Sequence, residues 1–408
     1  MADRLYQNAH LLCPATGLDG PGSLLARDGK IAATGDDIIA ASDAETIDCH
    51  GKILCPGLID MQVFAADPEA AAKGGVTTAL LHPRRGAELD SPSKVRAIFA
   101  GNRGQTARTI PMGAATRDLA GHEMTEIGLM GEAGVPAFGD GRKTIADTAV
   151  FMRILTYASS FNTLILNAAE EPRLTEGTCA TMTDLSVRLG LPAAPTFAEA
   201  MMIQRDLRLI EATGARLHIP IISCAESVAL IADAKARGLT VTCGTTPAYF
   251  ALNEIAIGEY ATFAKLRPPL RTEDDRMAIT KAIGDGVIDI ICSGHHPLTE
   301  EEKRLPYDQA EAGMVGLETL LALSLNLVRD GVLSQSALLA MLTQKPADIL
   351  QLSTGRLSIG APADLALLDV NAPWKVSKES LVSAAKNTPF DGLPVQGTAT
   401  QPWLGRWA

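Results

Sequence analysis

The chain has 408 residues, of which 47% are hydrophobic but only 4% aromatic, so it can bury a sizeable core made mostly of aliphatic side chains. Lys and Arg number 36 against 47 Asp and Glu, and the net charge of −11 argues against a protein that binds nucleic acid. No apolar stretch reaches membrane-spanning length and the first residues do not resemble a signal peptide, so we expect no membrane association.

The seven cysteines are scattered through the chain and form no C-x-x-C pair. They lie in apolar surroundings at positions 13, 49, 55, 179, 224, 243 and 292. This pattern indicates reduced, buried thiols, and we therefore expect a cytoplasmic protein.

The two ends of the chain are rich in short predicted strands. Residues 4–55 alternate apolar runs with turns at Thr16-Gly17, Asp28-Gly29 and His50-Gly51. Residues 355–369 are typical of a turn, a strand, a second turn and a second strand. We expect residues 1–55 and 345–408 to pair into one composite β-sandwich domain.

The long middle of the chain alternates buried-strand candidates with amphipathic helices, as in a parallel sheet covered by helices. The strand candidates are residues 75–81, 163–166, 216–222, 240–243 and 288–292, and the helix candidates are 144–159, 197–213, 227–237 and 317–329. A (β/α)8 barrel needs ~250 residues, and residues 56–344 can hold one. The predicted fold class is therefore α/β, a TIM-like barrel with a small β-sandwich domain.

The sequence PGLIDMQVF at 56–64 resembles the first-strand motif of the amidohydrolase superfamily, P-G-x-I/V-D-x-H-x-H. In that superfamily the two histidines bind the catalytic metal at the end of the first barrel strand. Their places are taken here by Gln62 and Phe64. A phenyl ring cannot bind a metal and a carboxamide does so poorly, so this pair of ligands is predicted to be missing.

Three further segments resemble dihydroorotase, the cyclic amidohydrolase of pyrimidine synthesis, and the resemblance covers nearly the whole chain. The first is TTP at 245–247 with LNE at 252–254, which is similar to T-P-H-H-L…T-E. The second is KLRPPLR at 265–271, which is similar to K-x-N-P-P-L-R. The third is GMVGLET at 313–319, which is similar to G-x-x-G-L-E-T. The resemblance implies an amidohydrolase-type barrel. It also implies zinc to activate a water, an Asp to transfer the proton, and Arg and Asn to hold the substrate carboxylate.

The positions that carry these roles in the family are degenerate in this chain. By resemblance, the metal ligands fall on Gln62, Phe64, Ala168 and Ile221, the catalytic Asp on Gly294, the substrate Arg on Ala66 and the substrate Asn on Arg84. The replacements are mostly apolar or small, as suits a barrel that no longer holds a metal. We therefore expect a pseudoenzyme with no cofactor.

Two alternatives stay open. In the first, Asp140, His295 and His296 form an altered zinc site of a working cyclic amidohydrolase, although adjacent strand residues point to opposite faces and do not easily share one metal. In the second, the vestigial pocket senses a pyrimidine precursor, with Arg84 or Arg267 on its carboxylate. The neighbouring pair Glu170-Glu171 is predicted to be a charge pair at a helix N-terminus before Pro172.

Some bacterial members of the family are noncatalytic and associate with aspartate carbamoyltransferase, whose assembly and activity they support. The resemblance therefore implies that this chain is a structural or regulatory partner of the aspartate carbamoyltransferase catalytic subunit. It also implies a homodimer.

Overall fold

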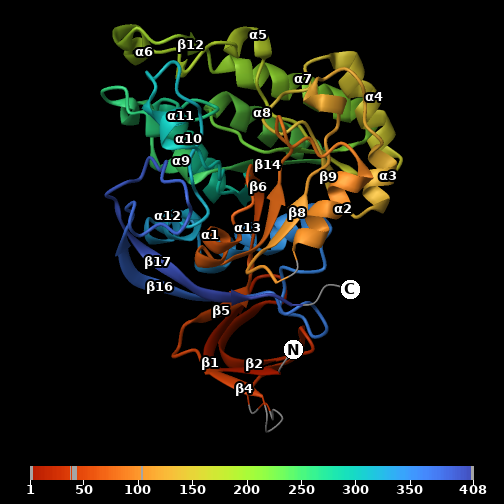
Figure 1. The fold of residues 1–408 in the computed structure, drawn as a ribbon, viewed down its shortest axis with the longest axis vertical. Coiled ribbons are helices and arrows are strands. Elements are labelled where there is room, and N and C mark those ends of the chain that lie inside the picture. The colour runs from red at the N-terminus through yellow and green to blue at the C-terminus, as the bar shows by residue number, and fades with distance from the viewer. Residues whose placement is uncertain (1–2, 37, 39–43, 103, 406–408) are drawn as a thin grey trace.

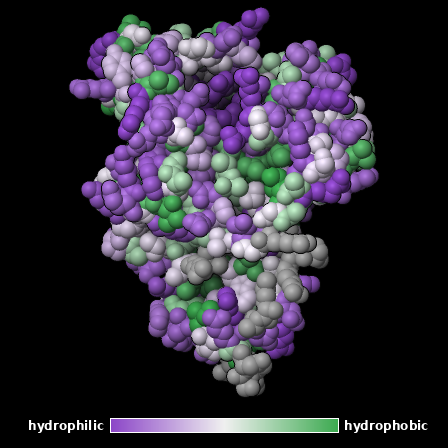
Figure 2. Space-filling model, viewed as in Figure 1, coloured by the Kyte–Doolittle hydropathy of each residue, from purple (hydrophilic) through white to green (hydrophobic). Residues whose placement is uncertain are grey.

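The computed structural model describes residues 3–36, 38, 44–102 and 104–405. A barrel of strands and helices stands on a smaller sheet, which lies at its lower end in Figure 1. The surface in Figure 2 is mostly hydrophilic, and its hydrophobic side chains lie in small separate groups. Among the described residues, no helix has both the length and the apolar character needed to cross a lipid bilayer.

Eight parallel strands form the barrel. They make a three-stranded sheet in the order β6-β7-β8 and a five-stranded sheet in the order β15-β14-β13-β10-β9. Parallel bridges from Gly113 to Phe138 and from Val63 to His295 join the two sheets at both seams, which closes the ring. The strands are β6 (Leu58–Val63), β7 (Val76–Leu81), β8 (Arg108–Pro111), β9 (Ala137–Phe138), β10 (Leu164–Leu166), β13 (Arg216–Ile219), β14 (Val241–Thr245) and β15 (Ile290–Ile291). The predicted α/β class with a TIM-like barrel is confirmed, and the smaller domain, predicted as a β-sandwich, is one mixed sheet.

Helices follow the barrel strands and pack around them. The principal ones are α1 (Pro68–Lys73), α2 (Pro92–Gly101), α3 (Ile127–Glu132), α4 (Thr148–Ser159), α7 (Phe197–Thr213), α8 (Ala225–Ala236), α10 (Glu273–Gly284) and α12 (Leu320–Arg329). An excursion between β10 and α7, at the top of Figure 1, holds α5 (Pro172–Thr175), β11 (Ala180–Thr181), α6 (Asp184–Leu189) and β12 (Ala193–Ala194). The other helical segments are α9 (Pro247–Ala251), α11 (Glu300–Arg304), α13 (Gln335–Leu342), α14 (Gln344–Ile349), η1 (Arg117–Leu119), η2 (Glu254–Ile257) and η3 (Thr262–Ala264).

Strands from both chain ends share the smaller sheet. Its order is β17-β16-β5-β1-β2-β3, with β4 beside β1, and β5 pairs antiparallel with β16. One face buries a separate aliphatic cluster that includes Leu24, Ile31 and Leu54. The strands are β1 (Arg4–Cys13), β2 (Leu18–Arg27), β3 (Lys30–Gly35), β4 (Glu45–Asp48), β5 (Ile53–Pro56), β16 (Leu365–Lys375) and β17 (Pro394–Trp403).

The strand predicted just before Gly360 is wrong. In the structure residues 355–363 contain no strand, and only β16 forms in the predicted segment. The reason is that this stretch is held by separate hydrogen bonds, from Gly360 N to Ile31 O in β3 at 2.7 Å and from Ala363 N to Gly29 O in the β2–β3 turn at 3.0 Å. The burial of all seven cysteines was predicted correctly, and all are free thiols.

Gly57 joins β5 to β6, where the small sheet passes into the barrel. A Cβ at this position would overlap the side chain of Thr77, which is fully buried. We expect Gly57→Ala to lower the free energy of unfolding by about 1–3 kcal/mol through overpacking, measured by urea denaturation. Gly20→Ala is the control, since that position has open space around it. An equal loss in both variants would contradict overpacking at Thr77 as the cause.

Candidate functional site

Functional residues of TIM-like barrels lie at the carboxyl ends of the strands. Side chains from several loops meet at this end of the barrel. We call them the barrel mouth: Gln62, Phe64, Arg142, Ala168, Glu170, Ile221, Arg267 and His296. Arg142 was not predicted, although it lies only two residues after Asp140, which was a candidate metal ligand.

Phe64 is buried within the mouth, at a position where the resemblance implies a metal ligand. Its ring centroid lies 5.2 Å from that of His82 and 5.4 Å from that of His296. The guanidinium carbon of Arg142 lies 5.2 Å from the centroid of the same ring, close enough for a cation–π contact. The aromatic ring therefore packs between two imidazoles and a cation.

Arg142 links the loop after β9 to the loops around β15. Its Nη1 donates to Nδ1 of His296 at 2.7 Å and to the carbonyl oxygen of Ala312 at 2.6 Å. Because an arginine can only donate, the 2.7 Å contact makes His296 Nδ1 an acceptor and this imidazole neutral, and the longer 3.2 Å approach of Nδ1 to Ala312 O is then not a hydrogen bond. Burial, followed by the charge of Arg142, lowers the pKa of His296 to about 3.

Arg267 lies across the same opening and pairs with Glu170. Arg267 Nε donates to Glu170 Oε2 at 2.5 Å, and Arg142 Nη2 lies 3.4 Å from the carbonyl oxygen of Arg267. The prediction of a Glu170-Glu171 pair at a helix end is wrong for Glu170, because the acid instead meets this arginine. Glu171 does cap α5, accepting a hydrogen bond from Leu174 N at 2.8 Å.

Little space remains in the barrel mouth. One cavity of about 30 Å³ is lined by the polar side chains of Gln62, Arg142, Glu170 and Arg267 and by apolar neighbours that include Ala168 and Ile221. A second, of about 20 Å³, is lined by several of the same residues together with Phe64 and Gly294. Each has room for roughly one or two waters, whereas small-molecule sites measure about 300–1,000 Å³.

The side chains of the mouth do not fit a zinc ion. Firm zinc sites use at least three protein ligands from Cys, His, Asp and Glu. In the part of the chain that the structure describes, no group of three or more such side chains is placed to hold a metal. The fixed cation of Arg142 would also repel a metal ion.

The three residues of the alternative zinc site are each engaged elsewhere. Asp140 accepts hydrogen bonds from Ala115 N at 3.1 Å and Thr116 N at 2.9 Å, and from the Thr116 hydroxyl. His295 Nδ1 accepts from Gly316 N at 3.3 Å, while His296 Nδ1 is taken by Arg142. Asp140 therefore connects the loop after β9 to the loop after β8 by hydrogen bonds. The structure does not bring Asp140, His295 and His296 together as a metal site.

Two further predicted positions lie outside the cavities. Ala66 is exposed just before α1, and Arg84 is exposed in a tight turn whose backbone pairs with Ala87. Of the two arginines proposed for a sensor, only Arg267 lines the mouth. Gly294 does line the second cavity, with φ of +64°, and a Cβ there would lie 3.1 Å from Thr246 Cγ2.

Comparison with known proteins gives the same family as the motifs. Residues 51–227 match the family described as dihydro-orotase-like, and residues 163–404 match the amidohydrolase family. The chain is 40% identical over 365 residues to a dihydroorotase of Desulfotalea psychrophila, covering 86% of this chain and 87% of the relative. The chain belongs to the dihydroorotase family. A dihydroorotase of Syntrophus aciditrophicus is 37% identical over 407 residues, and the match covers 96% of this chain and 96% of the relative.

Solved structures agree on the amidohydrolase fold. L-hydantoinase from Arthrobacter aurescens superposes with a TM-score of 0.86 at 26% identity, covering 99% of this chain and 95% of that protein. Dihydropyrimidinase from Brevibacillus agri gives a TM-score of 0.84 at 22% identity, covering 98% and 93%. This dihydroorotase-family chain therefore has the amidohydrolase fold over nearly its whole length.

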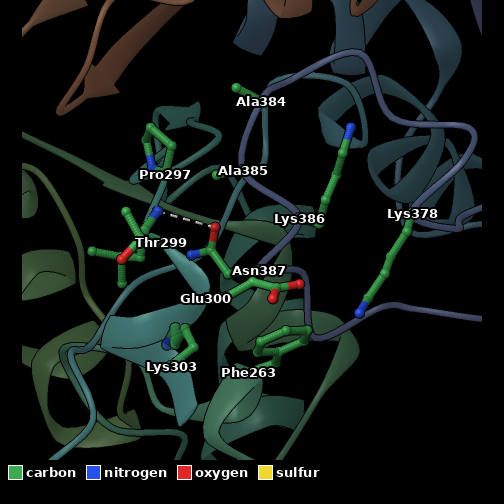
Figure 3. Close-up of a pocket in the computed structure, with 11 residues that line it drawn as sticks. Phe263, Pro297, Thr299, Glu300, Lys303, Lys378, Ala384, Ala385, Lys386 and Asn387 are labelled. Atoms are coloured by element: carbon green, nitrogen blue, oxygen red, sulfur yellow. Dashed lines mark hydrogen bonds between the residues drawn. The ribbon is translucent and has the colours of Figure 1, made fainter. Parts of the chain in front are cut away.

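A larger cavity of about 450 Å³ lies between η3, α11 and the loop 378–387 (Figure 3). Most of its polar groups already have protein partners. Lys303 Nζ donates to three backbone carbonyl groups, Lys386 Nζ donates to Leu381 O at 2.6 Å, and Asn387 Oδ1 accepts from Leu298 N at 3.2 Å. This arrangement explains how the loop is fixed to the barrel and indicates no particular ligand.

Restoring the first-strand histidines tests how far the mouth has departed from a metal site. We expect the Gln62→His, Phe64→His double variant to retain far less than one zinc per chain. Two ligands fall short of the three that a firm site needs, and Arg142 still holds a positive charge nearby. Mass spectrometry of the purified protein measures the zinc, with the Syntrophus aciditrophicus dihydroorotase as comparison. Stoichiometric zinc in the double variant would contradict this account.

Proposed function

We propose that this dihydroorotase-family chain is a catalytically inactive, cytoplasmic protein of pyrimidine biosynthesis. We propose further that it acts as a structural or regulatory partner of the aspartate carbamoyltransferase catalytic subunit. The observation that carries the loss of activity is the filled barrel mouth. Phe64 and Arg142 occupy it, no three-ligand set is present among the described residues, and the remaining cavities have volumes of about 30 and 20 Å³.

The partner is supported by family resemblance and by a physical consideration. A complete barrel with a filled mouth has no chemistry that would explain why the fold is kept. A surface that another protein needs would explain it. We also propose a homodimer on the same family grounds.

The second candidate function is hydrolysis of dihydroorotate or a related cyclic amide. It is favoured by the names of the relatives, which are dihydroorotases at 34–40% identity. Such an activity would require the mouth to open and a metal to be bound by residues that the structure holds apart.

The decisive experiment measures zinc content and dihydroorotate hydrolysis on one sample of the full-length protein, before and after zinc is supplied. We expect no bound zinc and no turnover, with the Desulfotalea psychrophila dihydroorotase as the positive control. Turnover together with stoichiometric zinc would overturn the proposed inactivity.

Co-expression tests the partner separately. The chain is expressed with and without the aspartate carbamoyltransferase encoded by the same genome. We expect the two proteins to co-purify, and we expect transferase activity or assembly to fall when this chain is left out. Light scattering of the isolated chain should give about twice the chain mass of 42.9 kDa. A monomer would contradict the proposed dimer, and independent purification of a fully active transferase would contradict the partnership.

A further inference from the structure

The barrel mouth holds more positive than negative charge at close range. Glu170 is paired with Arg267 at 2.5 Å. Arg142 makes its hydrogen bonds to neutral acceptors, namely His296 Nδ1 at 2.7 Å and the carbonyl oxygens of Ala312 and Arg267 at 2.6 and 3.4 Å. Within the described residues, no carboxylate lies within ion-pair distance of Arg142. A half-buried cation without a counterion is unfavourable.

Two polar side chains beside Arg142 also lack partners. Gln62 is 6% exposed, and its buried Oε1 has no hydrogen-bond partner within the described protein. Thr246 is 1% exposed, and its hydroxyl is likewise unpaired within the described protein. Leaving a buried polar group without a hydrogen bond costs about 1–3 kcal/mol.

These groups converge on the two small cavities. Gln62, Arg142 and Arg267 line both cavities, and Thr246 lines the second. The carboxamide of Gln62 can rotate by half a turn to point its nitrogen into the cavity. Its oxygen and nitrogen have nearly the same shape, so the hydrogen-bond partners available decide which of them faces the cavity. The cavities thus offer hydrogen-bond donors from two guanidinium groups, an amide and a hydroxyl, and the one carboxylate in their lining, Glu170, is paired with Arg267.

We propose that the barrel mouth binds one small monovalent anion of halide size, held by Arg142, Gln62 and Arg267. The volume of about 30 Å³ excludes a cyclic amide but fits a single ion with its donors around it. An anion rather than a water is favoured because it also balances the charge of Arg142. The inference rests on the closed mouth of the proposed function but not on the partner protein.

Bromide is the probe, because it has the size of a bound halide and scatters anomalously. The full-length protein is exchanged into sodium gluconate and titrated with sodium bromide at constant ionic strength. We expect the unfolding temperature to rise and then saturate, as for a ligand that binds only the folded state. Crystals grown in bromide should show an anomalous peak between Arg142 and Gln62.

Two variants separate binding from folding. Arg142→Gln removes the charge, and Gln62→Met removes the amide donor while keeping the length and the net charge. We expect each to weaken bromide binding by at least about tenfold. Arg85→Gln is the matched control, since Arg85 is exposed and lines neither cavity. If Arg142→Gln does not fold, Gln62→Met still decides the question.

The outcomes distinguish this proposal from the inactivity of the chain. A water at the site, or bromide effects equal in Gln62→Met and Arg85→Gln, would overturn the anion site while leaving the inactivity untouched. A bromide peak in a protein that nevertheless turns over dihydroorotate would support the anion and overturn the inactivity.

Discussion

Replacing Arg271 with methionine should lower the free energy of unfolding by about 3–5 kcal/mol. Arg271 is 5% exposed and its partner Glu199 is 1% exposed. Arg271 Nη2 lies 3.1 Å from Glu199 Oε2, and its Nε donates to Ser223 Oγ at 2.9 Å. Its Nη1 reaches Thr181 Oγ1 at 3.3 Å, which ties β11 to the barrel. Removing the arginine leaves a carboxylate buried without its counterion, which is the source of the large loss.

Urea denaturation of three variants tests this account. Arg304→Met breaks the exposed pair with Glu300 and should cost no more than about 1 kcal/mol. The double variant Arg271→Met, Glu199→Leu should be more stable than Arg271→Met alone, because the uncompensated carboxylate is gone. A double variant that is less stable than the single one would show that lost packing, rather than the isolated charge, dominates.

The barrel was predictable from sequence where its elements are long and regular. The helix predicted at 197–213 coincides with α7, because its apolar residues keep a helical period and Gly214 ends it with φ of +66°. The predicted helix at 144–159 begins four residues later, at Thr148, because the Asp147 side chain caps it by accepting from Ala149 N and Val150 N. The predicted strand at 216–222 stops at Ile219, since Pro220 cannot continue the ladder.

One short strand of the barrel left no readable signal, although β10 and β15 are also short and fall within predicted strands. Strand β9 consists of Ala137 and Phe138 alone and was not predicted. Two residues cannot show a period, and what fixes them is pairing with β10 on one side and the bridge to Gly113 on the other. Tertiary contacts of this kind are absent from a single sequence.

Sequence motifs were enough to locate the positions where ligands of the family are replaced. They were not enough to predict which side chains fill the barrel mouth. Resemblance pointed to Phe64 and Gly294, because both fall inside recognisable strand-end motifs. Arg142 follows the Phe138-Gly139-Asp140-Gly141 segment, and the direction of a loop side chain depends on loops distant in sequence. Its contacts with His296 and Ala312 join residues 154 and 170 positions apart.

Acid should destabilise this protein steeply below pH 6.5. Burial lowers the pKa of His82 and His295 to about 4 and of His218 and His296 to about 3, against 6.5 in the unfolded chain. Between those values the unfolded state binds protons that the folded state does not, so stability falls as the pH falls.

Three buried acids, Asp60, Asp140 and Asp206, act in the opposite direction, because burial raises the pKa of each. Burial raises the pKa of Asp60 and Asp206 to about 6 from 3.8, and for Asp206 it outweighs the attraction of Arg205. Their folded forms bind protons that the unfolded chain does not, which adds stability as the pH falls through 6. At pH 5 the four histidines together take up about four protons on unfolding, whereas Asp60 and Asp206 together release about two. The net uptake by these six groups is therefore about two protons. For these six groups the slope is about 3 kcal/mol per pH unit, and the raised pKa of Asp140 reduces it.

Variants at two positions test both signs of this balance by urea denaturation at several pH values between 4.5 and 6. His218→Gln removes one of the four histidine protons and should reduce the slope by about 1.4 kcal/mol per pH unit. Asp206→Asn removes one opposing acid proton and should increase the slope by the same amount. Both predictions concern the slope of the free energy of unfolding against pH. A loss of stability that is equal at every pH leaves this slope unchanged in either variant. Slopes that stay unchanged in both variants would show that these groups do not titrate as their burial implies, and that acid acts on the protein elsewhere.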